Sequence, residues 1–270
     1  MGDSLIFLFL LILGCIIVIP LIIKYRWRKP RKDFTPEQRQ ILVENVSFYN
    51  ALTNEEKQKF EYRVSEFNLN YTYLGIKTTV NEKDKILIAA SAIIPIFSFP
   101  NWRYNRLKEI RIFPNNFNRQ FRVGQDNSII RGLVGFGYLE GKLLVSRPAL
   151  YQGYEVYNDR RNTCLHEFVH LIDMDDGTVD GVPEKLLQHK YVIPWLYIMR
   201  QEVIRIKTGY SDINDYATKN TGEFLAVVSE YFFERPEDFK NEHPRLFNVM
   251  NEIFKPTKSI SRRSKTKNNY

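Results

Sequence analysis

In this chain of 270 residues, the sequence HEFVH at residues 166–170 gives the clearest indication of the fold and of the chemistry that the fold supports. Side chains four residues apart lie on the same face of an α-helix, so His166 and His170 point the same way. The residues between and beside the two histidines are apolar, as expected of a helix buried beneath a cleft. The pattern therefore predicts a buried helix that carries two imidazoles toward one point.

Two imidazoles and a neighbouring glutamate are typical of a hydrolytic zinc site. Zinc is a borderline-soft ion that binds neutral imidazole well. Glu167 follows the first histidine, where its carboxylate accepts a proton from water that attacks a carbonyl carbon. We therefore expect one Zn²⁺ per chain and hydrolysis of a peptide or protein substrate. The alternative is a pair of core histidines with ordinary hydrogen-bond partners.

A third ligand is required, because a catalytic zinc ion takes three protein ligands and leaves the fourth position open. One known spacing points to Asp176, although residue 173 is then an aspartate in place of the expected glycine. Glu223 is another candidate, since it lies at the start of an otherwise apolar helix and a carboxylate there needs a partner. Glu230, two turns further along the same face, competes with Glu223.

The rest of the body alternates helical and strand-like stretches. Residues 35–38 and 53–56 predict helix starts, each with a threonine cap and a Gln or Glu at the reciprocal position. Residues 84–97 predict a buried helix that ends near Pro95 or Pro100. The other predicted elements are strands at 110–113 and within 132–146, including a hairpin, a helix at 158–174 capped by Asn158 or Asp159 and ending near Gly177, and helices at 194–207, 221–233 and 244–254.

The amino terminus predicts a membrane anchor. Residues 5–23 carry no charge, and nineteen residues of helix cover about 28 Å, close to the hydrocarbon thickness of a bilayer. Six cations follow between Lys24 and Lys32, and basic flanks stay on the cytoplasmic side. We expect a single-pass protein of the inner, cytoplasmic membrane whose catalytic domain faces the cytoplasm, with its basic flank against anionic lipid.

Charge is concentrated at the two ends of the chain. The net charge is +8, but twelve cations lie within residues 24–32 and 255–270, which leaves −4 for all other residues. A nucleic-acid partner is not expected, because such proteins spread basic surface over the folded domain. The predicted organisation is an anchor with its basic segment (1–32), a metallopeptidase domain (33–256) and a basic disordered tail (257–270).

Several blocks of the sequence resemble the Mlc titration factor A family of bacterial zinc peptidases, whose catalytic domain is similar to that of anthrax lethal factor. Residues 166–174, followed by Gly177 and the Gly-Val-Pro of 181–183, resemble that family's HEFAHKLDM and GVP stretches. Residues 215–217 and 222–233 resemble its DAYA and AECFAVLSEYFF stretches. More loosely, residues 86–113 and 143–146 look like its buried helix and strands, and the similarity extends over residues 34–254.

The resemblance implies a fold class and a set of roles. The fold class is α+β, a mainly helical zincin-like metallopeptidase domain with a small mixed sheet, preceded by one N-terminal transmembrane helix. Glu223 is implied as the third zinc ligand, which makes the site HExxH plus glutamate, the gluzincin type. Tyr216 is implied as a phenol that donates a hydrogen bond to the developing oxyanion, a recognised form of transition-state stabilisation.

This sequence departs from the family pattern in its apolar amino terminus and at residues 222–224, where Gly-Glu-Phe replaces Ala-Glu-Cys. The anchor separates this chain from relatives named for binding a soluble glucose repressor, so that partner is not carried over. The alternative function is a non-catalytic module that binds and sequesters a regulator protein at the membrane. An intact Glu167 argues against it, because a structural zinc site needs no general base.

Two further expectations concern the surroundings of the site. Asp173 lies three residues beyond His170 on the same side of the helix, so it either orients a metal ligand from behind or is a carboxylate in a solvated loop. Residues 143–146 are predicted to form an edge strand that pairs with an extended peptide substrate.

Overall fold

The structure is a computed structural model that describes residues 27–125, 127–155 and 160–255. The apolar segment 5–23 and the basic tail 257–270 lie outside the described residues. Within the part of the chain that the structure describes, no helix combines the length and apolar character that a membrane span requires.

Two helices near the amino terminus begin at the predicted threonine caps. The α2 helix (Pro36–Asn45) follows Thr35 and the α4 helix (Asn54–Asn70) follows Thr53. Each threonine hydroxyl accepts a hydrogen bond from the backbone amide three residues on, whose side chain in turn accepts from the threonine backbone N–H. Both predicted helix starts are confirmed, and a short α3 (Ser47–Asn50) lies between them.

The α5 helix (Glu82–Ile93) is the predicted buried helix, and it ends before Pro95 as expected. All its residues from position 86 onward are buried, and its small side chains allow the neighbouring helices to approach closely. Asp84 is also buried, but its carboxylate lies 2.8 Å from the guanidinium of Arg147. The charge is therefore compensated, and α5 forms the inner support on which the site helix packs.

Among the described residues, four strands form one small mixed sheet. Their spatial order is β1 (Thr72–Gly75), β2 (Glu109–Phe113), β4 (Lys142–Ser146) and β3 (Gly132–Leu133). The first three run parallel to one another, whereas β3 is antiparallel to β4. The predicted hairpin is confirmed, and its connection contains the 3-10 turn η1 (Gly137–Leu139).

One prediction about the sheet is wrong, because β4 is an interior strand and not an edge strand. Leu144 pairs with Arg111 of β2 on one side and with Leu133 of β3 on the other. Leu143, Leu144 and Val145 are all buried, and such a continuous apolar run is typical of a strand covered on both faces. The backbone of β4 is already paired, so the edge beside the site belongs to β3.

The site helix α7 (Thr163–Asp173) follows α6 (Arg147–Glu155) and begins later than predicted. Its cap is Asn162, whose side chain accepts a hydrogen bond from the amide of Leu165 at 3.0 Å. The cap predicted at residues 158–159 is therefore wrong, and those residues lie outside the described part of the chain. The predicted end is confirmed, since η2 (Met174–Asp176) closes on Gly177 with a φ of 110°.

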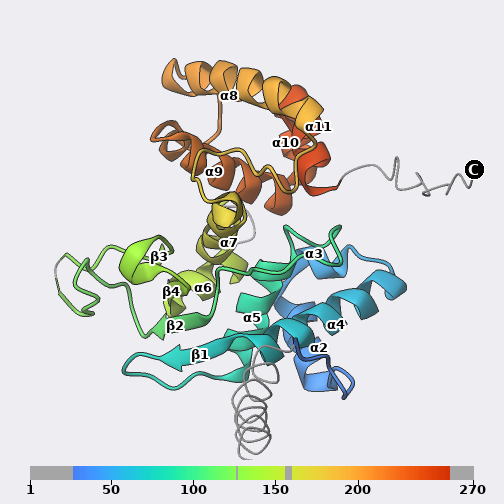
Figure 1. Cartoon of the computed structure of the whole chain (residues 1–270), viewed down its shortest axis with the longest axis vertical. Coiled ribbons are helices and arrows are strands. Elements are labelled where there is room, and N and C mark those ends of the chain that lie inside the picture. Colours follow the sequence, from blue (N-terminus) through green and yellow to red (C-terminus); the bar gives the residue numbers. More distant parts are fainter. Residues whose placement is uncertain (1–26, 126, 156–159, 256–270) are drawn as a thin grey trace, which may run out of the picture.

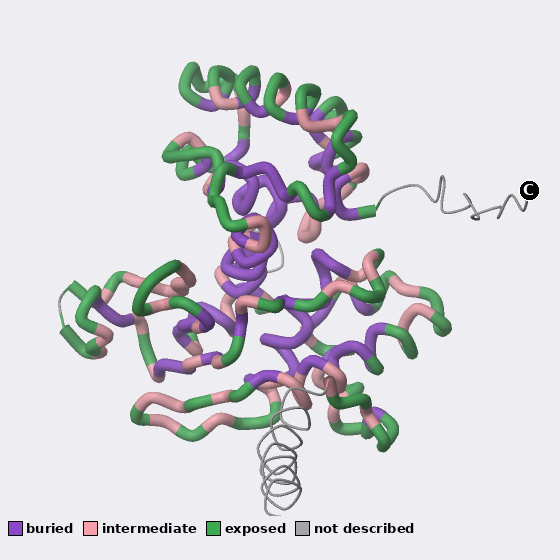
Figure 2. Tube along the Cα trace, viewed as in Figure 1, coloured by how far each residue is buried: buried purple, intermediate pink, exposed green. Residues whose placement is uncertain are grey.

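Four helices complete the carboxyl-terminal part of the described chain: α8 (Val192–Lys207), α9 (Thr221–Glu234), α10 (Pro236–Glu242) and α11 (Pro244–Phe254). Figure 1 shows α7 in the middle of the molecule, between these helices and the part formed by the sheet and α2 to α5. Figure 2 shows that burial is densest along α7 and α5, while the outer side of α8 is exposed. The 3-10 turns η3 (His189–Tyr191) and η4 (Asp215–Thr218) lie in the connections.

Candidate metal centre

The two histidines of α7 face the same point, as the helical spacing predicts. Their ring centroids are 4.8 Å apart, the planes meet at 80°, and the Nε2 atoms lie 3.1 Å from each other. His166 is buried and His170 is nearly so, in a helix whose other residues pack into the core. The local helix geometry alone therefore presents two nitrogen atoms to a single position.

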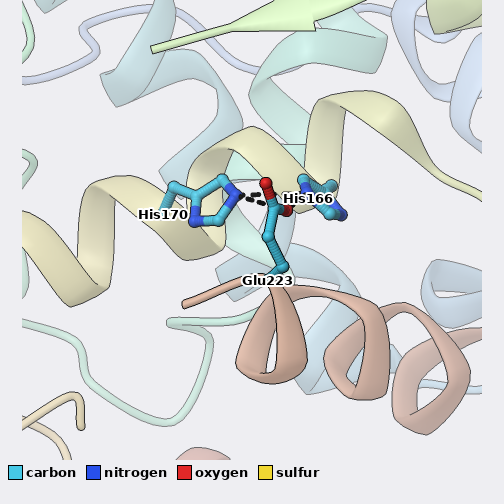
Figure 3. A group of neighbouring side chains, drawn as sticks. All are labelled: His166, His170 and Glu223. Atoms are coloured by element: carbon cyan, nitrogen blue, oxygen red, sulfur yellow. Dashed lines mark hydrogen bonds and ion pairs between the residues drawn. The ribbon is translucent and has the colours of Figure 1, made fainter. Parts of the chain in front are cut away.

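Glu223 reaches the same position from α9. Asn220 caps that helix by accepting a hydrogen bond from the Glu223 amide at 2.8 Å, which fixes the first turn. The Oε2 atom of Glu223 lies 3.0 Å from Nε2 of His166 and 3.2 Å from Nε2 of His170 (Figure 3). We call these three atoms the metal triangle.

The metal triangle fits a tetrahedral zinc ion. With metal-ligand bonds of about 2.0–2.1 Å, tetrahedral geometry separates the ligand atoms by about 3.3 Å. The observed sides of 3.0 to 3.2 Å are close to that separation. These are the only His, Cys, Asp or Glu side chains in the described residues that converge in this way.

Glu230 lies behind His166 and does not belong to the metal triangle. Its Oε1 is 2.5 Å from Nδ1 of His166, and its Oε2 accepts a hydrogen bond from the amide of Asn162 at 2.7 Å. When Nδ1–H of His166 donates to this carboxylate, Nε2 carries its lone pair toward the metal triangle. Three lone pairs then converge, and a cation is the natural partner for them.

The electrostatics of the metal triangle follow from this burial. Burial alone would lower the pKa of His166, but the nearby Glu230 and Glu223 carboxylates raise it well above 6.5. Burial alone would raise the pKa of Glu223, yet hydrogen bonds from both histidines lower it far below its usual range. Metal binding at neutral pH must therefore displace a proton from His166.

Glu167 is buried beside the metal triangle, on the side of the cleft. Burial raises the pKa of its carboxyl group, while the two neighbouring histidines act in the opposite direction. A carboxylate with a raised pKa is a better proton acceptor, which suits a general base. The residue therefore has the position and the environment that the predicted role requires.

Gly132 of β3 is a residue that the sequence pattern does not single out. A Cβ atom at this position would lie 2.8 Å from Cγ and Oε1 of Glu167 and 2.7 Å from Cγ2 of Thr163. Only glycine allows the edge strand to approach α7 this closely. The sequence shows only a glycine at the start of a predicted strand. That this glycine lies against the general-base candidate becomes evident only once the packing of β3 against α7 is known.

Tyr216 lies on η4, opposite α7 across the cleft. Its hydroxyl donates a hydrogen bond to Oε1 of Glu223 at 3.1 Å, and the ring centroid is 6.2 Å from that of His166. The side chain of Lys219 is also present, with Nζ 3.1 Å from the Tyr216 hydroxyl and 3.5 Å from Glu223. Tyr216 is 46% exposed, so its hydroxyl is accessible to a substrate.

A network of polar side chains holds the segment of residues 208–220, which we call the η4 segment; its partners Tyr231, His243 and Glu202 are buried. Asp212 of this segment accepts hydrogen bonds from the hydroxyl of Tyr231 at 2.8 Å and from Nε2 of His243 at 2.6 Å. The other nitrogen of His243 lies 3.1 Å from Glu202 of α8, and Arg160 lies 2.7 Å from Asp212. Sequence reasoning missed this network because its members are distributed over 84 positions of the chain, from residue 160 to residue 243.

Asp173 and Asp176, the two aspartates after His170 that the sequence analysis considers, have separate environments. Asp173 is fully buried, and its Oδ2 accepts a hydrogen bond from the amide of Gly181 at 3.0 Å, so it is not a carboxylate in a solvated loop. Burial raises the pKa of Asp173 to about 6. Asp176 accepts hydrogen bonds from Thr178 at 2.9 Å and lies outside the metal triangle.

A cavity of about 840 Å³ opens beside the metal triangle. One wall comes from residues 119, 120, 127 and 129–133, which include the edge strand. The other side is formed by two further walls, the start of α7 with the residues just before it and the η4 segment with α9. His166, Glu167 and Tyr216 are among its lining residues. The cavity is large enough for several residues of an extended peptide.

A helix with HExxH, a glutamate from a second helix and an open cleft define a metallopeptidase-type domain. The chain belongs to the glucose-regulated metallo-peptidase M90 family, whose family model matches residues 23–255. The predicted resemblance to the Mlc titration factor A family is thereby confirmed.

Similar proteins come from several bacteria. An uncharacterized protein of Synechocystis, slr2042, is 26% identical over 242 residues, which cover 84% of this chain and 88% of the relative. Mlc titration factor A of Yersinia enterocolitica is 23% identical and covers 83% of this chain and 88% of its own length. Mlc titration factor A of Pectobacterium atrosepticum is 20% identical, with 86% and 91% covered.

Proposed function

We propose that this chain is a zinc-dependent metallopeptidase in which His166, His170 and Glu223 hold the metal ion and Glu167 is the general base. The convergence of two imidazole nitrogens and a carboxylate oxygen within 3.2 Å of one another carries this proposal. Membership of a metallopeptidase family supports it. When bound, zinc would polarise the substrate carbonyl and lower the pKa of a water molecule.

The chain's own residues supply the proton transfers and the charge stabilisation. Glu167 accepts the proton from the attacking water and returns it to the amine that leaves. Its buried position holds the proton at the carboxylate between the two steps. Tyr216 donates a hydrogen bond from its hydroxyl to the oxyanion that develops on the substrate, and Lys219 keeps that hydroxyl in place.

Replacing Glu167 by glutamine tests this assignment. The E167Q variant keeps the shape of the side chain but has no carboxylate to accept the proton. We expect zinc near one ion per chain in both proteins and a fall in turnover of about a thousandfold, measured on a fluorescence-quenched peptide library. Undiminished turnover by E167Q would refute Glu167 as general base.

A second candidate function is suggested by the name Mlc titration factor A of the relatives, which points to capture of a regulator protein. On this alternative, the chain binds zinc but holds a protein partner without cleaving peptides. Wild-type protein that contains zinc and leaves the whole library intact would favour it. The two candidates are therefore separated by the same experiment.

The membrane location of the protein is part of the same proposal and rests on the sequence of residues 1–32. The uncharged segment 5–23 would hold the protein in the inner membrane, with the cations that follow it on the cytoplasmic side. Anionic lipid would bind this flank. Protein that resists alkaline extraction from membranes, and is cleaved by protease in inverted but not in right-side-out vesicles, is the expected result.

A further inference from the structure

The cavity beside the metal triangle is lined by more cations than acids. Arg119 and Arg131 belong to one wall, and Arg160, Arg161 and Lys219 belong to the other side. The acidic lining residues are Glu167 and Glu230, and both face the histidines of α7. The open part of the cavity is therefore basic.

This excess does not reflect a generally basic protein. Outside the two basic ends of the chain, the remaining residues carry a net charge of −4. Cations gathered in one cleft of an otherwise mildly acidic body concentrate a positive potential there. Such a potential attracts and orients negatively charged ligands.

The cations differ in what already compensates them. Arg160 forms an ion pair with Asp212 at 2.7 Å and lies over the ring of Tyr231, so it supports the η4 segment. Lys219 contacts Tyr216 and Glu223. Because these two side chains already contact groups of the site, their charges are partly compensated within the protein.

The charges of Arg119 and Arg131 are not compensated by an acidic side chain among the described residues, so they are available to a ligand. The guanidinium of Arg131 donates a hydrogen bond to the neutral amide of Gln152 at 2.9 Å, which holds it in place without cancelling its charge. Arg119 is exposed and forms no ion pair within the described residues. The antiparallel bridge between Phe117 and Ile130 joins the two segments that carry these arginines into one wall, with Arg119 and Arg131 on opposite sides of the bridge.

The position of Arg131 relates this charge to the scissile bond. It directly precedes Gly132, the residue whose backbone lies against the Glu167 carboxylate. Because Arg131 also lines the cavity, we infer that a substrate side chain that contacts it belongs to a residue near the bond on which Glu167 acts. Guanidinium groups bind carboxylates through paired, charge-assisted hydrogen bonds, and a neutral amide of the same shape cannot replace them fully.

We propose that this cleft selects acidic peptides, with Arg131 binding an aspartate or glutamate side chain close to the scissile bond and Arg119 binding another one further along the same wall. The proposal rests on the peptidase function proposed above and names its substrate class. It also predicts preferential binding of acidic peptides when hydrolysis is blocked.

Binding to the full zinc-loaded chain carrying E167Q tests the proposal without hydrolysis. The probes are fluorescein-labelled alanine octapeptides with two central glutamates or two central glutamines, measured by fluorescence anisotropy. We expect the glutamate peptide to bind about tenfold more tightly at low salt. The ratio should approach one in 0.5 M NaCl, because salt screens partly exposed charges.

Removing the arginine charges distinguishes this wall from general attraction. The double variant R119Q/R131Q should bind the two peptides with nearly equal affinity. The matched control is R122Q, which removes an exposed arginine from the same segment but outside the cavity lining and should keep the tenfold ratio. Equal binding by the parent protein, or an unchanged ratio in R119Q/R131Q, would overturn the proposal.

The outcome of this binding test can be distinguished from the outcome of the test of the peptidase function. A wild-type protein that binds glutamate peptides preferentially, but cleaves no peptide, would support the selection of acidic peptides by the basic cleft and refute the peptidase function. A wild-type protein that cleaves the quenched library, while its E167Q variant shows no preference for the glutamate peptide, would support the peptidase function and refute the selection of acidic peptides by the cleft.

Discussion

The two walls of the cleft that carry the site residues are built in opposite ways. On α7, His166 and Glu167 are buried, His170 is partly buried, and their relative positions follow from one turn of helix. Tyr216 and Lys219 are exposed on a short 3-10 turn, and the η4 segment is held from behind by Asp212, His243 and Glu202. The first wall depends on local geometry, whereas the second depends on contacts between distant parts of the chain.

This difference separates two kinds of substitution. A change on the α7 side removes a ligand or a proton acceptor outright, so its effect on metal content or turnover is large. A change behind the η4 segment leaves the metal triangle intact and displaces only groups that assist it. The following predictions test that division, from the largest expected effect to the smallest.

Glu223→Ala should have the largest effect, because it removes one corner of the metal triangle and leaves two imidazoles. We expect zinc affinity to fall by more than about a hundredfold, measured by competition with a chromogenic chelator. Asp176→Ala is the matched control and should keep zinc, since Asp176 lies outside the triangle. Loss of zinc in the control and its retention in Glu223→Ala would reverse the ligand assignment.

Gly132→Ala should reduce turnover strongly without removing zinc. The added Cβ would lie 2.8 Å from the Glu167 carboxylate, so β3 must move away from α7 or Glu167 must turn. We expect kcat to fall by about a hundredfold or more and stability to fall by about 1–3 kcal/mol.

Gly135→Ala provides the control for that change. A Cβ at Gly135 would meet nothing nearer than 3.4 Å, so both turnover and melting temperature should stay close to wild type. If Gly132→Ala has wild-type kcat, the contact between the edge strand and Glu167 has no bearing on catalysis.

Tyr216→Phe tests the exposed wall directly. It removes the hydroxyl that donates to Glu223 and that we assign to the oxyanion, while the ring remains. We expect kcat to fall by about a hundredfold with zinc content unchanged. An unchanged kcat would exclude the hydroxyl from the reaction, and an effect on KM alone would assign it to binding.

His243→Gln should have the smallest effect on turnover, about tenfold in kcat, since it loosens the η4 segment from behind. The substitution should also change how the free energy of unfolding depends on pH. Burial alone would lower the pKa of His243, but hydrogen bonds to Glu202 and Asp212 raise it above 6.5.

The sign of that dependence follows from the raised pKa. The folded protein holds the proton on His243 more tightly than the unfolded chain, so the stabilisation is fully present below about pH 6.5 and is lost as the pH rises through the folded-state pKa. The free energy of unfolding of wild type should therefore fall more steeply above pH 6.5 than that of His243→Gln. Parallel curves from urea titrations would show that His243 does not stabilise the fold through its charge.

The sequence by itself determined the elements whose cause is local. The caps at Thr35 and Thr53, the buried α5 and the shared face of His166 and His170 depend on neighbouring residues only. The family-specific stretches selected Glu223 among the candidate ligands and added Tyr216. For these features, short-range hydrogen bonds and helical periodicity decide the outcome, and both are visible in the order of the residues.

Only the tertiary structure decided the features that depend on how distant elements pack. Glu223 and Glu230 lie seven residues apart on α9, and the crossing of α9 over α7 turns one to Nε2 of His166 and the other to Nδ1. The interior position of β4, the closeness of Gly132 to Glu167 and the network behind Asp212 have the same origin. The physical reason is that a side chain's partners across the core are set by the packing of whole elements, which no local pattern encodes.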